Sequence, residues 1–149
     1  MNIEEITVDH LLYEKALDLR YELFFKGFNL PKSVTADELE SDSMHVVLSN
    51  GTQLLSYGRL SPLGSGTYRI SQIVVPEKYR RNGYATIVVK QLVDLAKQAA
   101  PGMGKLKFRY RSLTVLGRLG ARAIEQGGSP LLGRRRDALL VTRIGLLGL

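Results

Sequence analysis

The sequence lacks cysteine altogether, which excludes disulfide bonds, thiolate catalysis and cysteine-ligated zinc. It has only two histidines, His10 and His45, so we expect no histidine-based metal site. No apolar run approaches the roughly 20 residues that a membrane-spanning helix needs. The N-terminus carries acidic residues where a secretion signal carries basic ones. These absences favour a cytoplasmic protein that holds no metal and contacts no membrane.

Acidic residues are scarce in the second half of the chain. Residues 1–75 contain six Lys/Arg and ten Asp/Glu, which gives a net charge of −4. Residues 76–149 contain fifteen Lys/Arg and four Asp/Glu, which gives a net charge of +11. This asymmetry indicates that the second half meets an anion, either a small phosphorylated cofactor or a nucleic acid. The alternative is a set of solvated basic side chains, and the short run Arg134–Arg136 beside Gly133 is typical of a loop.

With 149 residues, the chain has the usual size of one domain, and we expect residues 1–149 to form a single mixed α/β domain. Hydrophobic periodicity predicts strands over 2–8, 44–49, 53–60, 67–75, 105–110, 121–126 and 138–144, and helices over 10–26, 85–99 and 115–119. Asp9 is the expected N-cap of the first helix. Asn50-Gly51 predicts a hairpin, and with a second turn over 61–66 it makes residues 44–75 an antiparallel meander. Residues 127–130 are typical of a turn.

Residues 28–44 are polar and acidic, with four carboxylates at Asp37, Glu38, Glu40 and Asp42 and a short helix expected to start near Thr35. We favour a solvated surface loop. The functional alternative is an acidic wall that attracts a cationic substrate.

The turn Arg80–Ala85 lies between an apolar strand and the clearest amphipathic helix. The N-terminus of a helix exposes unpaired N–H groups and the positive end of the helix dipole, and both suit phosphate. Lys78, Arg80 and Arg81 add positive charge, and Gly83 lets the backbone approach a ligand closely. Neither a Walker A sequence nor the three-glycine dinucleotide fingerprint is present.

This segment resembles the acetyl-CoA binding motif of the GNAT superfamily of N-acetyltransferases, whose signature is Q/R-x-x-G-x-G/A. Arg80, Gly83 and Ala85 match it, after a strand ending Ile73–Pro76 and before a long helix. The order of elements resembles the family over nearly the whole chain. The resemblance implies an α/β (α+β) fold: a mixed central sheet of six to seven strands, an antiparallel N-terminal meander, flanking helices, and two strands that splay apart at the CoA site.

The resemblance also implies how acetyl-CoA is bound. The turn would hold the pyrophosphate through backbone N–H groups, Thr86 would add a hydroxyl, and the end of the strand would pair its backbone with the pantetheine arm. The expected cofactor-binding residues are Ile73, Val74, Val75, Lys78, Arg80, Arg81, Asn82, Gly83, Tyr84, Ala85 and Thr86.

In this family an amine attacks the thioester directly, which implies acetyl transfer to a primary amine of a small molecule, peptide or protein. The acceptor would be cationic if the acidic segment borders its site. Residues 115–121 sit where relatives carry a pattern whose tyrosine protonates the departing thiolate. That position is Leu116 here. Three alternatives follow: the thiolate needs no dedicated acid, Tyr110 is the substitute, or the chain no longer catalyses transfer.

The sequence shows no general base. Ser71 and Gln72 could only position a water, and His45 is more simply an ordinary strand-end histidine. The alternative function is a non-catalytic CoA-binding or nucleic-acid-binding module on the same fold. The family is often dimeric, and the apolar tail Leu146–Leu149 is either a dimer contact or the end of an edge strand.

Overall fold

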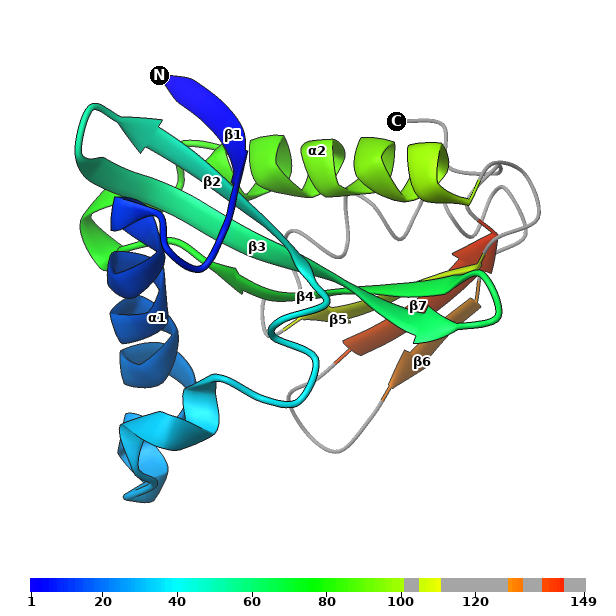
Figure 1. Cartoon of the computed structure of the whole chain (residues 1–149), viewed down its shortest axis with the longest axis horizontal. Coiled ribbons are helices and arrows are strands. Elements are labelled where there is room, and N and C mark those ends of the chain that lie inside the picture. The colour runs from blue at the N-terminus through cyan, green and yellow to red at the C-terminus, as the bar shows by residue number, and fades with distance from the viewer. Residues whose placement is uncertain (101–104, 111–128, 133–137, 144–149) are drawn as a thin grey trace.

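The computed structural model describes residues 1–100, 105–110, 129–132 and 138–143. Within these residues, seven strands form one sheet of order β1-β2-β3-β4-β5-β7-β6 (Figure 1). The elements are β1 (Asn2–Ile6), α1 (Leu11–Phe24), β2 (Met44–Asn50), β3 (Gln53–Gly64), β4 (Thr67–Val74), α2 (Tyr84–Ala99), β5 (Lys105–Tyr110), β6 (Ser129–Leu132) and β7 (Ala138–Arg143), with 3-10 turns at Lys26–Phe28, Lys32–Thr35 and Glu77–Tyr79.

The sheet is mixed because one connection contains a helix. Strands β1 to β4 pair antiparallel in chain order, as the hairpin signals predict. Strand β5 pairs parallel to β4, since α2 carries the chain back across the sheet between them. Strands β5, β7 and β6 are antiparallel. The result is the mixed α/β architecture expected from the sequence.

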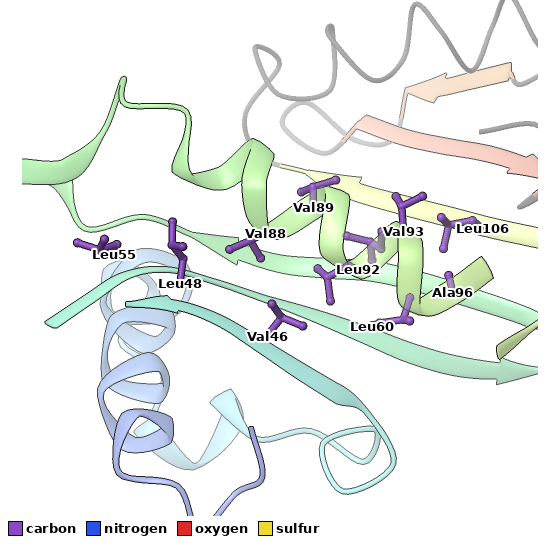
Figure 2. Close-up of a cluster of buried hydrophobic side chains, with 11 residues drawn as sticks. Val46, Leu48, Leu55, Leu60, Val88, Val89, Leu92, Val93, Ala96 and Leu106 are labelled. Carbon is purple, nitrogen blue, oxygen red and sulfur yellow. The ribbon is translucent and has the colours of Figure 1, made fainter. Parts of the chain in front are cut away.

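The two long helices cover opposite faces of the sheet (Figure 1). Adjacent residues of a strand point to opposite faces, so Val46 and Leu48 pack beneath α2, whereas Val47 packs beneath α1. The α2 side is the larger core, and Figure 2 shows side chains of α2 lying over those of β2, β3 and β5: Val46, Leu48, Leu55, Leu60, Val88, Val89, Leu92, Val93, Ala96 and Leu106.

Gly58 of β3 allows α2 to lie close to the sheet. A Cβ atom on this residue would lie 2.5 Å from Ile73 Cδ1, 2.7 Å from Leu92 Cδ1 and 2.8 Å from Val88 Cγ1. Three side chains therefore occupy the space that any larger residue would need. This contact fixes α2, and with it the turn that precedes α2, against the middle of the sheet.

Some local predictions were wrong. The N-cap of α1 is His10, whose Nδ1 accepts the Leu12 N–H at 3.2 Å, rather than Asp9. The helix expected to start near Thr35 is a 3-10 turn that ends there. In the hairpin, Asn50 pairs with Gln53, so the turn residues are Gly51 and Thr52.

Two further differences concern the strands. Strand β3 runs on to Gly64, beyond the start of the turn predicted over 61–66. Ser129 and Pro130 belong to β6 instead of a turn. Proline is tolerated there because β6 is the edge strand of the sheet that the described residues form. The strand predicted over 121–126 and the helix predicted over 115–119 lie outside the described residues.

Candidate functional site

The turn between β4 and α2 has a backbone that the sequence explains. Gly83 is the residue before the helix and adopts the left-handed conformation, with φ 77° and ψ 10°. Glycine adopts that conformation without a steric penalty. Arg81 also has a positive φ, of 66°. The Asn82 side chain secures the turn by donating from Nδ2 to the carbonyls of Tyr79 at 2.9 Å and Arg80 at 3.2 Å.

The first turn of α2 presents N–H groups without an acceptor. The first intrahelical bond runs from the Ile87 N–H to the Gly83 carbonyl, at 3.2 Å, and no side chain caps the helix. Within the part of the chain that the structure describes, the N–H groups of Tyr84, Ala85 and Thr86 therefore remain available. Four residues before the helix, Arg80–Gly83, are exposed to solvent. The arrangement is suited to an anion.

Strand β4 contains a bulge just before this turn. Tyr57 of β3 pairs with Val74, but Arg59 pairs with Ser71, so β4 has one residue more than β3 between these pairs. Gln72 lies in this bulge and has a positive φ of 59°. A bulge of this kind bends its strand and redirects side chains.

The parallel pairing of β4 with β5 ends next to the bulge. The last pair is Ile70 with Phe108, although β4 continues to Val74 and β5 to Tyr110. The backbone of β4 beyond Ile70 is therefore not hydrogen-bonded to β5 in the described residues.

The side chains at the end of β4 are structural. Ile73 packs into the core beneath α2, and Val74 is buried beneath α1. The Val74 carbonyl accepts from Ser56 Oγ at 3.1 Å, and the Val75 carbonyl accepts from Arg80 Nε at 3.4 Å. Any ligand along this strand would consequently meet its backbone and not these side chains.

A cluster of charged side chains lies beside the bulge, on the α1 face of the sheet. Arg20 is fully buried, and its guanidinium donates to the Glu40 carboxylate at 2.7 and 2.9 Å. Arg59, also buried, donates to the same carboxylate at 2.7 Å and to Asp37 at 2.8 and 2.9 Å. Arg20 also donates from Nε to Gln72 Oε1 at 3.2 Å. Two positive and two negative charges thus balance one another within the cluster.

The cluster corrects the interpretation of the acidic segment. Asp37 and Glu40 were expected to belong to a solvated loop or to an acidic wall. Both instead bind buried arginines, because each guanidinium needs a counter-charge when it leaves water. Glu40 is buried, whereas Asp37 lies at the edge of the cluster, with 37% of its side chain exposed. Glu38 and Asp42, the other two carboxylates of the segment, are exposed to solvent.

The pKa of Glu40 follows from these neighbours. Burial alone raises the pKa of a carboxyl, but hydrogen bonds and charge from Arg20, with help from Tyr13 and Arg59, outweigh it and lower the Glu40 pKa to about 2. The Tyr13 hydroxyl donates to Glu40 at 2.7 Å, and its pKa is raised to about 12 by burial and by the carboxylate. Both groups therefore keep one protonation state at neutral pH.

His45 is a member of the same cluster and does not act as a free base. Its Nε2 lies 2.9 Å from the Glu40 backbone carbonyl, which can only accept, so Nε2 carries the proton. Its Nδ1, 2.7 Å from the Tyr57 hydroxyl, must then accept from that hydroxyl. Burial lowers the His45 pKa, with the two arginines contributing to the same effect. Burial raises the pKa of Tyr57. The histidine is structural, as its position at a strand end suggested.

A hollow of about 390 Å³ lies on the α1 side of the sheet, next to the β2–β3 turn and residues 76–79. Its lining includes Lys15, Asp18, Glu22 and Lys78. Lys15 donates to the Thr52 carbonyl at 2.6 Å, and Asp18 pairs with Lys32. Of the residues expected to bind the cofactor, Lys78 alone lines this hollow.

The other predicted residues are placed as follows. Tyr110 is the last residue of β5 and pairs with Ala138 of β7. Leu116, the Arg134–Arg136 run and the tail Leu146–Leu149 lie outside the described residues. In the residues that are described, no group of three or more His, Asp or Glu side chains is placed to hold a metal ion. None of the helices in that part of the chain combines the length and apolar character needed to cross a bilayer.

Sequence reasoning missed three residues of the charged cluster, Arg20, Arg59 and Tyr57, and considered Gln72 only as a residue that could position a water. Arg20 had a detectable signal. It follows Ala16 by four residues, so it lies on the buried stripe of α1, where a charged residue needs a partner. Arg59 stands between Gly58 and Leu60 in a strand that has no other charged residue. Nothing local marked Gln72 as the residue with positive φ.

The sequence of the chain matches a known protein family. Residues 12–117 match the pattern of the acetyltransferase (GNAT) family. The chain is 33% identical over 87 residues to YjcF of Bacillus subtilis, an uncharacterized N-acetyltransferase. That alignment covers 58% of this chain and 59% of the relative, so the chain spans only about three-fifths of that relative's length.

Solved structures share the fold over almost the entire chain. Aminoglycoside 6′-acetyltransferase type Ii superposes with a TM-score of 0.73 at 15% identity, covering 97% of both chains. An aminoglycoside 6′-N-acetyltransferase complexed with coenzyme A superposes with a TM-score of 0.67 at 14% identity, also covering 97% of both chains. At these identities the likeness establishes the fold alone.

Proposed function

The chain belongs to the acetyltransferase (GNAT) family, and from that premise we propose that it transfers acetyl from acetyl-CoA directly to a primary amine. The family match favours this function over the binding module that the sequence left open. A structural neighbour with coenzyme A bound supports the choice of donor.

The observation that carries the proposal is the turn at the start of α2. Three N–H groups without acceptors in the described residues point from a helix N-terminus whose preceding residues are exposed and basic. The CoA pyrophosphate would accept from these groups, with Arg80 and Arg81 close by and the Thr86 hydroxyl as an added donor. The left-handed Gly83 leaves the approach open, since no atom lies within 4 Å of where its Cβ would be.

The pantetheine arm would lie where β4 and β5 stop pairing. Beyond Ile70 the backbone of β4 has no partner in β5, and the side chains of Ile73 and Val74 are turned into the two cores. This is the arrangement that a strand splay requires, because the amide groups of pantetheine can continue the ladder where the pairing with β5 ends. The thioester would then lie close to the bulge at Gln72.

In the proposed reaction the amine nitrogen attacks the thioester carbonyl. A C–N bond forms, the C–S bond breaks, and the electron pair leaves on the CoA sulfur. The nitrogen gives up its proton to water, and the thiolate takes a proton from a donor, for which we propose Tyr110 at the end of β5. The buried Ser71 hydroxyl, which has no hydrogen-bond partner in the described residues, supports a role in positioning the water.

The acceptor is a primary amine of a small molecule, a peptide or a protein. Glu38 and Asp42, the exposed carboxylates of the segment between α1 and β2, would favour a cationic acceptor. That preference is weaker than the sequence suggested, because Asp37 and Glu40 are neutralised by buried arginines.

The test substitutes Gly83→Glu and measures CoA affinity by titration calorimetry, together with release of free thiol from acetyl-CoA in the presence of an amine panel. The new carboxylate would occupy the phosphate position and repel it. We expect CoA affinity to fall at least about tenfold, because loss of even one charge-assisted hydrogen bond costs ~1.5–3 kcal/mol.

Gly64→Glu is the matched control. Gly64 has a φ of 88° and Gly83 a φ of 77°, and both have open space around the Cβ position, so both substitutions impose the same kind of backbone strain. Gly64 lies at the end of β3, far along the chain from the turn. Normal CoA binding by Gly83→Glu, or an equal loss in the control, would contradict the placement of the pyrophosphate.

A further inference from the structure

We propose that Arg20 is a positioning residue that holds the β4 bulge open through its hydrogen bond to Gln72. The inference rests on the proposed function, because the bulge lies close to where the thioester end of the pantetheine arm would lie. It assigns a task to a buried arginine that lies outside the turn at the start of α2.

Arg20 is immobilised by its other contacts. Beyond the two bonds to Glu40, its guanidinium donates to the Thr35 carbonyl at 2.9 Å and to the Tyr57 hydroxyl at 3.2 Å. The guanidinium carbon also lies 5.2 Å from the centre of the Tyr57 ring. Because the guanidinium group is planar and rigid, these four hydrogen bonds fix the direction of its remaining Nε–H group. That group donates to Gln72 Oε1 at 3.2 Å.

Gln72 needs such an anchor because its backbone conformation is unfavourable for a residue with a side chain. A φ of 59° is uncommon outside glycine, asparagine and aspartate, and it persists only where surrounding contacts enforce it. The side chain of Gln72 reaches Arg20 on the α1 face, while its neighbour Ile73 packs beneath α2. The hydrogen bond therefore ties the bulged residue to one face.

The position of this anchor decides what it controls. The pairing between β4 and β5 ends at Ile70 and Phe108, two residues before Gln72. If the bulge relaxed to an extended strand, β4 would regain a regular register and its free backbone could pair with β5. The bond from Arg20 thus favours the open arrangement that pantetheine needs.

The experiment uses Gln72 variants, because removing Arg20 would leave Glu40 with a buried charge and could unfold the protein. Gln72→Met keeps the side-chain length but cannot accept from Arg20 Nε. Affinity is measured by calorimetry for CoA and for the phosphorylated ADP portion of CoA, which lacks pantetheine. We expect Gln72→Met to weaken CoA about tenfold, the effect of losing one hydrogen bond to a charged group, and to leave the nucleotide fragment unchanged.

Two companion variants separate positioning from direct contact. Gln72→Gly also lacks the bond but populates positive φ freely, so it should bind CoA more tightly than Gln72→Met. Gln98→Met, an exposed position on α2, is the control for the substitution itself and should match the wild type.

The outcomes are distinct from those of the proposed function. If the wild type binds both ligands and Gln72→Met binds CoA equally well, the positioning role is wrong. If Gln72→Gly is as weak as Gln72→Met, the side chain acts by contact and the positioning role is again wrong. If the wild type binds neither CoA nor the fragment, the proposed function is wrong, and the positioning role of Arg20 is wrong as well.

Discussion

Replacing Glu40 by glutamine tests the charged cluster most directly. Glu40 receives hydrogen bonds from Arg20, Arg59 and Tyr13, and its side chain is 8% exposed. Its pKa falls from 4.5 to about 2 on folding. At ~1.4 kcal/mol for each pKa unit, the ionised carboxylate contributes on the order of 3 kcal/mol to folding.

The pH at which this contribution appears follows from the two pKa values. The folded-state pKa is the lower one, so the stabilisation is fully present above the unfolded value of 4.5 and is lost as pH falls towards about 2. A glutamine side chain at this position cannot ionise. The substitution should therefore cost about 3 kcal/mol near neutral pH, consistent with the ~3–5 kcal/mol typical of a broken buried pair. The difference from wild type should shrink steadily below about pH 4.5.

Urea unfolding followed by circular dichroism, repeated between about pH 7 and pH 3, measures both effects. Glu38→Gln is the control, since Glu38 is an exposed carboxylate of the same segment and its substitution should stay within ~0.5 kcal/mol of wild type. The reasoning is refuted if Glu40→Gln behaves like Glu38→Gln at neutral pH. It is refuted equally if the loss caused by Glu40→Gln is the same at every pH.

Two further predictions concern the packing of α2 and the leaving group. Gly58→Ala should destabilise the protein by ~1–3 kcal/mol in urea unfolding, because three side-chain carbons lie within 2.8 Å of the new methyl group. Unchanged stability would mean that α2 does not depend on this close approach. Tyr110→Phe should lower kcat about tenfold without changing CoA affinity, since general acids contribute ~10²–10⁴-fold and a thiolate needs less help than most leaving groups. An unaltered kcat would remove Tyr110 from the reaction.

The predicted fold and the observed fold agree where the sequence pattern is local. The helix after the turn was expected at Ala85–Ala99 and begins one residue earlier, at Tyr84. The meander of β2, β3 and β4 follows the predicted hairpins. Its strand ends were less predictable, as β3 extends to Gly64, because pairing with a neighbour and not local composition decides where a strand stops.

The two halves of the candidate site differed in how far they could be predicted. The cofactor turn depends on one stretch of sequence, and Gly83 has the left-handed backbone that suits a glycine in such a turn. The roles of these residues in binding CoA stay predictions, as do those of Tyr110 and Leu116 in catalysis. The charged cluster could not be predicted because its members come from α1, the segment after it, β2, β3 and β4, and each ion pair joins residues some 20 positions apart.

By itself, the sequence determined the basic turn, its left-handed glycine and the amphipathic helix that follows, since each of these depends on residues that are close together in the chain. Only the tertiary structure decided that two carboxylates of the acidic segment pair with arginines, because a buried guanidinium must be neutralised by whatever charge the fold brings near it. It also decided the bulge at Gln72, a residue with positive φ whose side chain accepts a hydrogen bond from Arg20, 52 residues earlier in the chain.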